Sequence, residues 1–334
     1  MNEQPACSAA PTGIWEVSGA GMEIIDSHHH LWDTRALDYP EFAGNEDLDR
    51  PFLAADYDAA ATACGVTASI CVEAASAGAP GASETQWLLR ETACSQLIAG
   101  VVAWAPVEDL GIAPYLARLL AFAGPGQAAG PPVVGIRRGF ETARPEFLLM
   151  PEVVAGVRAV GAAGLPFDLL VSAAQMPAAA ELVRLCPGTR FVIDHVGAPP
   201  RGEAATRRWR VALARLAQCA RVACKLSGLP AAAAGGWQPA DIAARLEVAL
   251  ALFGSDRVLF GSDWPVSTSA GSAGLASWLA TVTAALGSLA AAERADALGA
   301  NARRIYGLGE PPGGNRHQRR LACHGTTTRG RALG

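Results

Sequence analysis

The chain has 334 residues, of which 51% are hydrophobic and 17% charged, and its formal net charge is −4. Neither value is typical of a disordered chain or of a nucleic-acid-binding surface, and the length suits either two domains or one (β/α)8 barrel with extensions. The eight cysteines include no CxxC pair and no zinc-knuckle spacing, which favours a reduced, cytoplasmic setting.

The two ends of the chain differ from its middle. Residues 1–21 contain Gly, Pro and Ser without an apolar period, and they are predicted to form a loose leader rather than a signal peptide. From Glu310 onward the chain carries five arginines against one glutamate, so residues 309–334 are predicted to be a disordered basic tail, with a nucleic-acid arm as the alternative. The folded domain is therefore expected to span residues 22–308.

The first predicted strand, Met22–His28, leads into three consecutive histidines. Side chains two apart on a strand leave the same face, so His28 and His30 converge on one point while His29 points the other way. A convergent imidazole pair can ligate a divalent metal or hold an anion, although three histidines in a row can also be a surface loop. The next segment, Asp33–Phe52, is predicted to be a long loop that forms a lid or a pocket wall.

Beyond this loop, apolar runs alternate with segments of helical period. Further strands are predicted at 66–73, 98–104, 133–137, 167–171, 190–195, 221–226 and 257–263. Helices are predicted at 56–64, 83–95, 114–122, 151–162, 176–185, 203–219, 239–253, 272–289 and 293–305. Eight buried strands alternating with helices predict an α/β protein with a closed (β/α)8 TIM barrel. An open doubly wound sheet is the alternative, but no G-x-G-x-x-G follows the first strand.

The run Trp264–Ala292 carries no charge and is long enough to span a bilayer. Its large apolar residues recur at steps of three and four, and small residues fill the other face. This spacing predicts an amphipathic helix packed on a core, and no membrane partner.

Polar side chains stand at one predicted strand end after another: His28 and His30 at the first strand, Arg137 and Arg138 at the fourth, His195 at the sixth, Lys225 and Ser227 at the seventh, and Asp263 at the eighth. The active site of a (β/α)8 barrel lies at these carboxyl ends of the strands. Asp263 is the predicted catalytic carboxylate, because a carboxylate near imidazoles or a metal can take a proton from water.

Each of these positions also has a purely structural interpretation. His195 can be a core histidine with satisfied hydrogen bonds, and Asp26 and Asp194 are expected to cap helices or anchor strands. Arg137 can be a surface cation, although an arginine after an apolar strand is costly unless it meets an anion. Lys225, the single lysine, can contact substrate or pack its stem inside and reach a carboxylate.

Seven motifs carry a family resemblance. In chain order they are IDSHHHLWD, VGIRRGF, GLPFDLLV, TRFVIDHVGAPP, VACKLSG, LFGSDWPV and NARRIYGL, and they lie within residues 22–308. The chain resembles the amidohydrolase superfamily and, within it, the amidohydrolase-related branch. That branch includes sugar lactonases of the L-fuconolactonase and L-rhamnonolactonase types and 2-pyrone-4,6-dicarboxylate lactonase.

The resemblance implies a role for each matching residue. His28 and His30 would be the H-x-H pair, His195 the third imidazole, and Asp263 the aspartate that activates water. Arg137 would hold an anionic or polar substrate group. Further substrate contacts are expected from Trp32, Tyr39, Phe140, Lys225 and Trp264.

The resemblance also bears on metal content. Members with two metals bridge them through a lysine at the fourth strand, where this chain has arginines, and the fifth strand offers no histidine. One divalent ion, zinc or manganese, is therefore expected on His28, His30 and Asp263 with His195 nearby, or none, since some relatives open lactones without metal. Glu141 departs from the glutamine that sugar lactonases often show.

The sequence thus predicts a hydrolase that opens a sugar-acid lactone, with the dicarboxylate lactone as an alternative substrate. A one-metal decarboxylase and a binding protein without activity are the other hypotheses. The expected partner is a small-molecule lactone, and a homo-oligomer is compatible with the sequence.

Overall fold

The computed structural model describes residues 22–74, 81–122, 132–233, 238–269 and 274–309. Its centre is one sheet in which each strand pairs in parallel with the next along the chain. The strands are β1 (Ile25–His29), β2 (Ala68–Val72), β3 (Ile98–Trp104), β4 (Val133–Gly139), β5 (Pro166–Leu170), β6 (Arg190–Ile193), β7 (Val222–Leu226) and β8 (Val258–Phe260). The predicted (β/α)8 barrel is confirmed.

Side chains and backbone together join the last strand to the first. A parallel bridge connects His29 to Trp264 just beyond β8. The buried carboxylate of Asp26 accepts hydrogen bonds from the backbone N–H of Ser262 at 2.8 Å and of His28 at 3.1 Å. Asp26 therefore has the strand-anchoring role that the sequence predicts. Burial raises the pKa of Asp26 to about 6 against the opposing effect of these hydrogen bonds.

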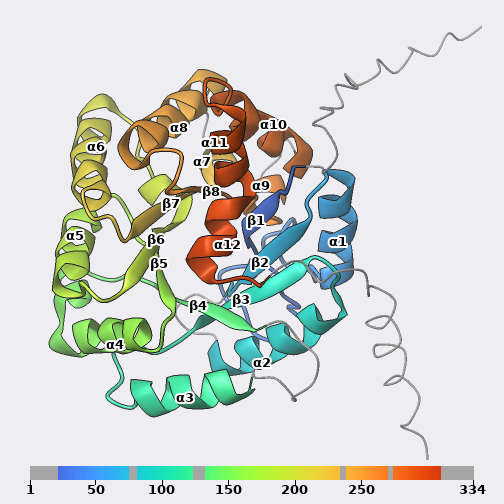
Figure 1. The fold of residues 1–334 in the computed structure, drawn as a ribbon. Helices are drawn as coiled ribbons and strands as arrows, with labels where there is room; N and C mark the ends of the chain where they lie inside the picture. The colour runs from blue at the N-terminus through green and yellow to red at the C-terminus, as the bar shows by residue number, and fades with distance from the viewer. Residues whose placement is uncertain (1–21, 75–80, 123–131, 234–237, 270–273, 310–334) are drawn as a thin grey trace, which may run out of the picture.

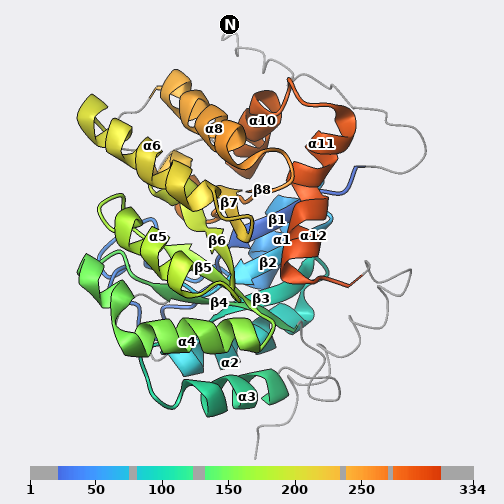
Figure 2. The same cartoon turned by 60° about the vertical axis from the view of Figure 1, so that its left-hand side comes forward.

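Helices surround the barrel, as Figures 1 and 2 show. The first half contains α1 (Ala54–Ala63), α2 (Gly81–Glu91), η1 (Thr92–Cys94), α3 (Ile112–Phe122), η2 (Pro145–Leu149), α4 (Pro151–Ala162) and α5 (Met176–Leu185). The second half contains η3 (Asp194–Gly197), α6 (Glu203–Ala217), α7 (Leu229–Ala233), α8 (Pro239–Phe253), α9 (Val266–Ser269), α10 (Leu275–Ala285), α11 (Ala291–Ala295), η4 (Asp296–Ala300) and α12 (Asn301–Tyr306).

The uncharged run near the C-terminus contains α9, α10 and the start of α11, and α10 is the amphipathic helix predicted at 272–289. Leu275, Trp278 and Val282 are buried against the core, at steps of three and four along this helix. No helix in the described part of the chain combines the length and apolarity that a bilayer crossing needs.

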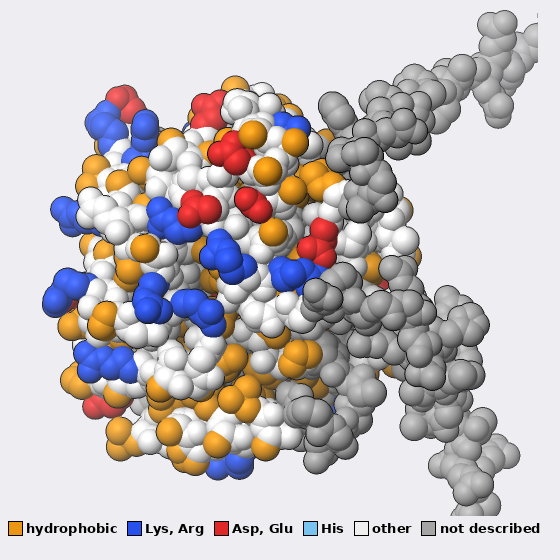
Figure 3. Space-filling view, viewed as in Figure 1, with side chains coloured by type: hydrophobic (Ala, Val, Ile, Leu, Met, Phe, Trp, Pro, Cys, Tyr) orange, Lys and Arg blue, Asp and Glu red, His pale blue; other side chains and the backbone are white. Residues whose placement is uncertain are grey.

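Helix α12 lies across the end of the barrel from which the strands start (Figure 1). Arg303 on this helix pairs with Glu23, two residues before β1. Ile305 and Tyr306 pack into the inner barrel core, whose strand residues are Ile25, Ala68, Ile70, Val72, Val102, Val134, Val192, Ala223 and Leu259. Figure 3 views the molecule from this side, and its cations are arginines because the single lysine, Lys225, is fully buried. The opposite end carries the carboxyl ends of the strands.

The structure differs from the sequence prediction mainly at element ends. The predicted strands 190–195 and 257–263 stop at Ile193 and Phe260, because the chain turns away there with left-handed residues. The predicted helix 293–305 consists of α11, the π-helical turn η4 and α12. The predicted leader, 1–21, and residues 310–334 of the predicted tail lie outside the described residues.

Candidate active site

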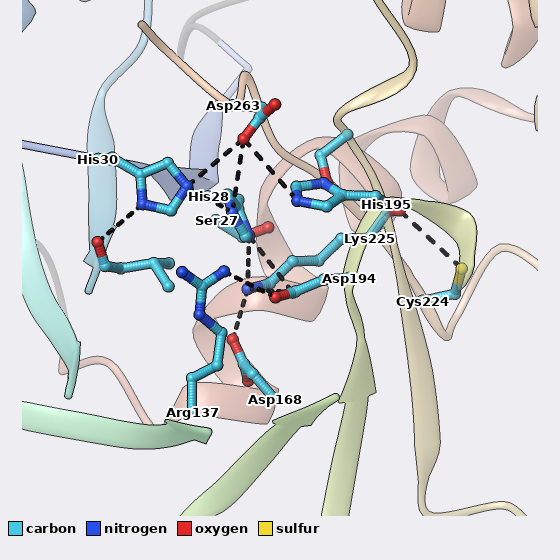
Figure 4. A network of polar contacts seen from close by, with 12 residues as sticks. Ser27, His28, His30, Arg137, Asp168, Asp194, His195, Cys224, Lys225 and Asp263 are labelled. Atoms are coloured by element: carbon cyan, nitrogen blue, oxygen red, sulfur yellow. Dashed lines mark hydrogen bonds and ion pairs between the residues drawn. The ribbon is translucent and has the colours of Figure 1, made fainter. Parts of the chain in front are cut away.

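Four side chains meet at the carboxyl end of the barrel (Figure 4). We call His28, His30, His195 and Asp263 the imidazole–carboxylate cluster. Oδ1 of Asp263 lies 3.7 Å from Nε2 of His28, 3.4 Å from Nε2 of His30 and 3.9 Å from Nε2 of His195. The structure therefore brings together the four residues that the sequence singles out as catalytic. His195 is the most exposed of them, with 19% of its side chain accessible.

The alternation of the first strand places the histidines as expected. His28 and His30 approach each other, with 3.1 Å between their Nε2 atoms, and Nδ1 of His30 donates to the Val72 carbonyl at 3.0 Å. His29 points the other way and stacks flat on Tyr57, with 3.6 Å between ring centroids. His29 thus points away from the cluster, as predicted, and packs behind the strand.

Two residues of the cluster have left-handed backbone conformations. His195 has φ of 52° and Asp263 has φ of 56°, a region that costs a residue with a Cβ atom roughly 1–2 kcal/mol. Nδ1 of His195 is hydrogen-bonded to Ser227 Oγ at 3.0 Å. Gly228, which has φ of 69°, lies so close that a Cβ atom there would be 2.3 Å from Nδ1 of His195. The backbone therefore turns the side chains of His195 and Asp263 toward His28.

A second group of charged side chains lies directly beneath the cluster. We call it the buried ion network, and it consists of Glu73, Arg137, Asp168, Asp194 and Lys225. Nε of Arg137 donates to Glu73 Oε1 at 2.6 Å, and its Nη1 donates to Asp194 Oδ2 at 3.2 Å. Nζ of Lys225 lies 2.5 Å from Asp168 Oδ2 and 3.0 Å from Asp194 Oδ1. Each cation of the network thus pairs with two carboxylates.

The surroundings set the charge state of the cluster. Burial raises the pKa of Asp263, but the imidazoles, His195 foremost, outweigh this effect and leave the pKa below its ordinary value. Burial and the charge of Lys225 hold the pKa of His28 well below its ordinary value, and burial lowers the pKa of His195. At neutral pH the cluster therefore presents the carboxylate of Asp263 beside the neutral imidazoles of His28 and His195, which is an arrangement that can accept a proton or bind a cation.

The cluster also fits a divalent metal ion. One ligand atom from each of His28, His30 and Asp263 lies within 4.8 Å of the other two. Two imidazole nitrogens and a carboxylate oxygen are a donor set that zinc accepts. A second group of donors, from His28, Asp194 and His195, shares one imidazole with the first.

Known proteins resemble this chain over most of its length. A family model described as amidohydrolase matches residues 25–308. The chain belongs to the amidohydrolase family. The match confirms the family predicted from the seven motifs and the expectation of an enzyme of this hydrolase class.

Three relatives of this amidohydrolase are informative. An L-fucono-1,5-lactonase of Burkholderia multivorans is 36% identical over 305 residues, which cover 87% of this chain and 98% of the relative. An L-fucono-1,5-lactonase of Burkholderia ambifaria is 29% identical over 293 residues, which cover 86% of this chain and 97% of the relative. A solved amidohydrolase from Burkholderia multivorans with bound zinc matches with a TM-score of 0.77 and 32% identity, over 86% of this chain and 100% of that chain.

The residues predicted to bind substrate occupy two kinds of position in this amidohydrolase. The aromatic residues Trp32, Tyr39 and Phe140 are buried, and Trp264 is 8% exposed. Lys225 lies fully buried beneath His28, with its ammonium group on carboxylates. Trp264 directly follows Asp263, and Arg137 and Lys225 lie in the buried ion network. Trp32 packs on Phe42 and Phe52, the hydroxyl of Tyr39 donates to Glu84, and Phe140 packs on Phe147 and Phe167. The contact of all six residues with substrate stays a prediction.

Sequence reasoning did not single out Glu73 and Asp168, which complete the buried ion network. Each is the one charged residue in its predicted strand, at the end of run 66–73 and inside run 167–171. A lone charge in a buried strand is costly unless it is paired, so this signal could have found both. Their partners could not be identified, because they come from distant strands.

Proposed function

We propose that this amidohydrolase is a lactonase that opens an uncharged sugar-acid lactone of the L-fucono-1,5-lactone type, using water activated by Asp263. Two relatives that align over nearly their whole length are named L-fucono-1,5-lactonases, which supports this substrate class. The identity of 36% supports the reaction class more strongly than the individual sugar.

The charge balance around the site is the observation that carries the choice of an uncharged lactone. The buried ion network and Asp263 together hold four carboxylates and two cations, and both cations already bind carboxylates. An anionic substrate would approach Asp263 and meet repulsion, and its carboxylate would have to compete for Arg137 with Glu73 and Asp194. This balance disfavours the alternatives that require an anion, namely a pyrone dicarboxylate lactone or the substrate of a decarboxylase.

Asp263 supplies the proposed base. Its Oδ2 accepts a hydrogen bond from Ser267 Oγ at 2.9 Å, which leaves Oδ1 facing the imidazoles. Oδ1 takes a proton from water as the water attacks the lactone carbonyl, and the protonated carboxyl then returns the proton to the leaving ring oxygen. The imidazole N–H groups of His28 and His195 stabilise the charge that develops on the carbonyl oxygen, while His30 orients the ring of His28.

A bound divalent ion would strengthen both steps. His28, His30 and Asp263 are the proposed ligands, and zinc is the proposed ion because the solved relative holds it. Such an ion polarises a carbonyl and makes bound water more acidic, which suits a base whose own pKa is low. Arg137 holds the carboxylates of Glu73 and Asp194 in place.

The reaction class is tested by two simultaneous measurements on the purified protein. Proton release and carbon dioxide release are followed with L-fucono-1,5-lactone, L-rhamnono-lactone, 2-pyrone-4,6-dicarboxylate and an aromatic carboxylic acid. The proposal expects rapid acidification with a sugar lactone and no carbon dioxide. Carbon dioxide release from the aromatic acid, or no proton release with any lactone, would overturn the proposal.

A further inference from the structure

The ammonium group of Lys225 fixes where His28 carries its ring hydrogen. Nζ of Lys225 lies 3.1 Å from Nδ1 of His28, deep inside the barrel where both side chains have no solvent exposure. An ammonium group has three donors and no acceptor, so Nδ1 of His28 must be the acceptor in this contact. A neutral imidazole has one N–H, and in His28 this N–H is then at Nε2.

The neighbouring histidine completes a chain of consistent donors and acceptors. The Val72 carbonyl can only accept, so Nδ1 of His30 carries hydrogen, and in the neutral form of this ring Nε2 carries a lone pair. That lone pair faces Nε2–H of His28 across 3.1 Å. Hydrogen bonds therefore run in one direction, from Lys225 to His28, then to His30, and finally to Val72. The two histidines of the H-x-H pair have opposite tautomers.

Lys225 is held rigidly in this position. Its Nζ lies 2.5 Å from Oδ2 of Asp168, and the hydroxyl of Tyr306 donates to the same carboxylate at 2.8 and 2.9 Å. Tyr306 comes from α12, at the opposite end of the barrel. A column of polar contacts thus connects α12 to His28 through the barrel core, and it leaves the ammonium group little freedom to turn away.

The other tautomer of His28 has its own acceptor. Oδ1 of Asp194 lies 3.3 Å from Nδ1 of His28 and 3.0 Å from Nζ of Lys225. If His28 carried its hydrogen at Nδ1, this oxygen could accept it and the lone pair at Nε2 would be available. Lys225 and Asp194 therefore favour different tautomers of the same ring.

We propose that Lys225 is a positioning residue that holds His28 in the Nε2–H form and so opposes metal binding by the cluster. A metal on His28, His30 and Asp263 needs a lone pair on Nε2 of both histidines, which the contact from Lys225 denies to His28. The site then has two states, a hydrogen-bonded one favoured by Lys225 and a metal-binding one in which Asp194 accepts from His28. The inference concerns the same site as the proposed function but does not depend on the substrate.

Nitrogen NMR of the zinc-free wild-type protein tests the tautomers directly. The protein is labelled with ¹⁵N-histidine, and its six histidines are assigned by single His→Gln variants. The proposal expects His28 as the Nε2–H form and His30 as the Nδ1–H form, and it expects added zinc to convert His28 to Nδ1–H. An Nδ1–H form of His28 without zinc would overturn it.

The variant Lys225→Met tests the effect on metal binding, with Arg137→Met as the matched control. Arg137 also pairs with Asp194, so both variants remove one positive charge from the buried ion network, but only Lys225 contacts the ring of His28. In Lys225→Met we expect the Nδ1–H form of His28 and zinc binding about 10-fold tighter than in Arg137→Met, measured by calorimetry. Equal zinc affinities and an unchanged tautomer would assign Lys225 a merely structural role. If Lys225→Met fails to fold, the wild-type spectrum alone decides the proposal.

Discussion

Gly228 and His195 are packed so closely that a Cβ atom on the glycine would lie 2.3 Å from Nδ1 of the imidazole. The glycine also has φ of 69°, a value that disfavours other residues. The loop after β7 thus fixes the position of a histidine that follows β6, and two strand ends form one side of the site together.

The substitution Gly228→Ala should therefore displace His195 from Asp263. We expect kcat/KM for the sugar lactone to fall about 100-fold, because displacing a catalytic group by 1 Å has an effect of this size. Gly202→Ala is the matched control, since Gly202 has φ of 82° and no atom within 4 Å of an added Cβ. Both variants should lose stability from backbone strain, and only Gly228→Ala should lose activity. Equal activity in the two would show that His195 is not needed in its present position.

Asp263→Asn should remove the general base while leaving the fold intact. An amide cannot take a proton from water, and loss of a general base costs about 10²- to 10⁴-fold in kcat. The exposed Asp47 provides the control variant Asp47→Asn, which should retain full activity. Initial rates of proton release, together with circular dichroism of each variant, make the comparison. Wild-type rates in Asp263→Asn would remove the proposed mechanism.

Ala198 offers a test of backbone strain beside the site. It is exposed and has φ of 47°, where a glycine would avoid the cost of a Cβ atom. Ala198→Gly should raise the free energy of unfolding by about 0.5–1 kcal/mol, measured by urea denaturation. Ala280→Gly, at an exposed position within α10, should lower it by about 1 kcal/mol. A loss of stability in Ala198→Gly would contradict this account of the turn.

Zinc binding should depend on His30 and not on its neighbour His29. The wild-type protein, first treated with chelator, should bind one zinc ion per chain, because His28, His30 and Asp263 form one donor set. His30→Gln should abolish this binding, whereas His29→Gln should retain it because His29 faces Ser69 and Tyr57. Elemental analysis after gel filtration measures the stoichiometry. Full zinc content in His30→Gln would place the ion elsewhere.

Much of the fold and of the cluster could be predicted from the sequence because both follow from strand periodicity. Strand alternation puts His28 and His30 on one face, and parallel strands of a barrel bring their carboxyl ends together. For the same reason Asp263 and His195 could be expected near them. The left-handed conformations of His195 and Asp263 could not be predicted. Nothing in Ile193–Gly197 or Ser262–Trp264 indicates that the sixth and eighth strands end earlier than their apolar runs.

The ion pairs inside the barrel could not be predicted from the sequence. Lys225 had two equal interpretations, and only the structure shows that its ammonium group reaches Asp168, 57 residues away along the chain. Arg137 similarly meets Glu73 across 64 residues. Such partners depend on which strands are neighbours and on which residues lie in the same layer of the barrel. The pattern of residue types along the sequence gives no information on either.

The central claim, an uncharged lactone opened beside a carboxylate-rich site, is tested most directly by comparing kcat/KM for L-fucono-1,5-lactone and for 2-pyrone-4,6-dicarboxylate. The comparison is made on one preparation at one pH and one ionic strength. We expect kcat/KM to be at least about 100-fold higher for the uncharged lactone, because juxtaposed like charges cost several kcal/mol. Equal or faster turnover of the dicarboxylate would contradict the account and assign Arg137 to an anionic substrate.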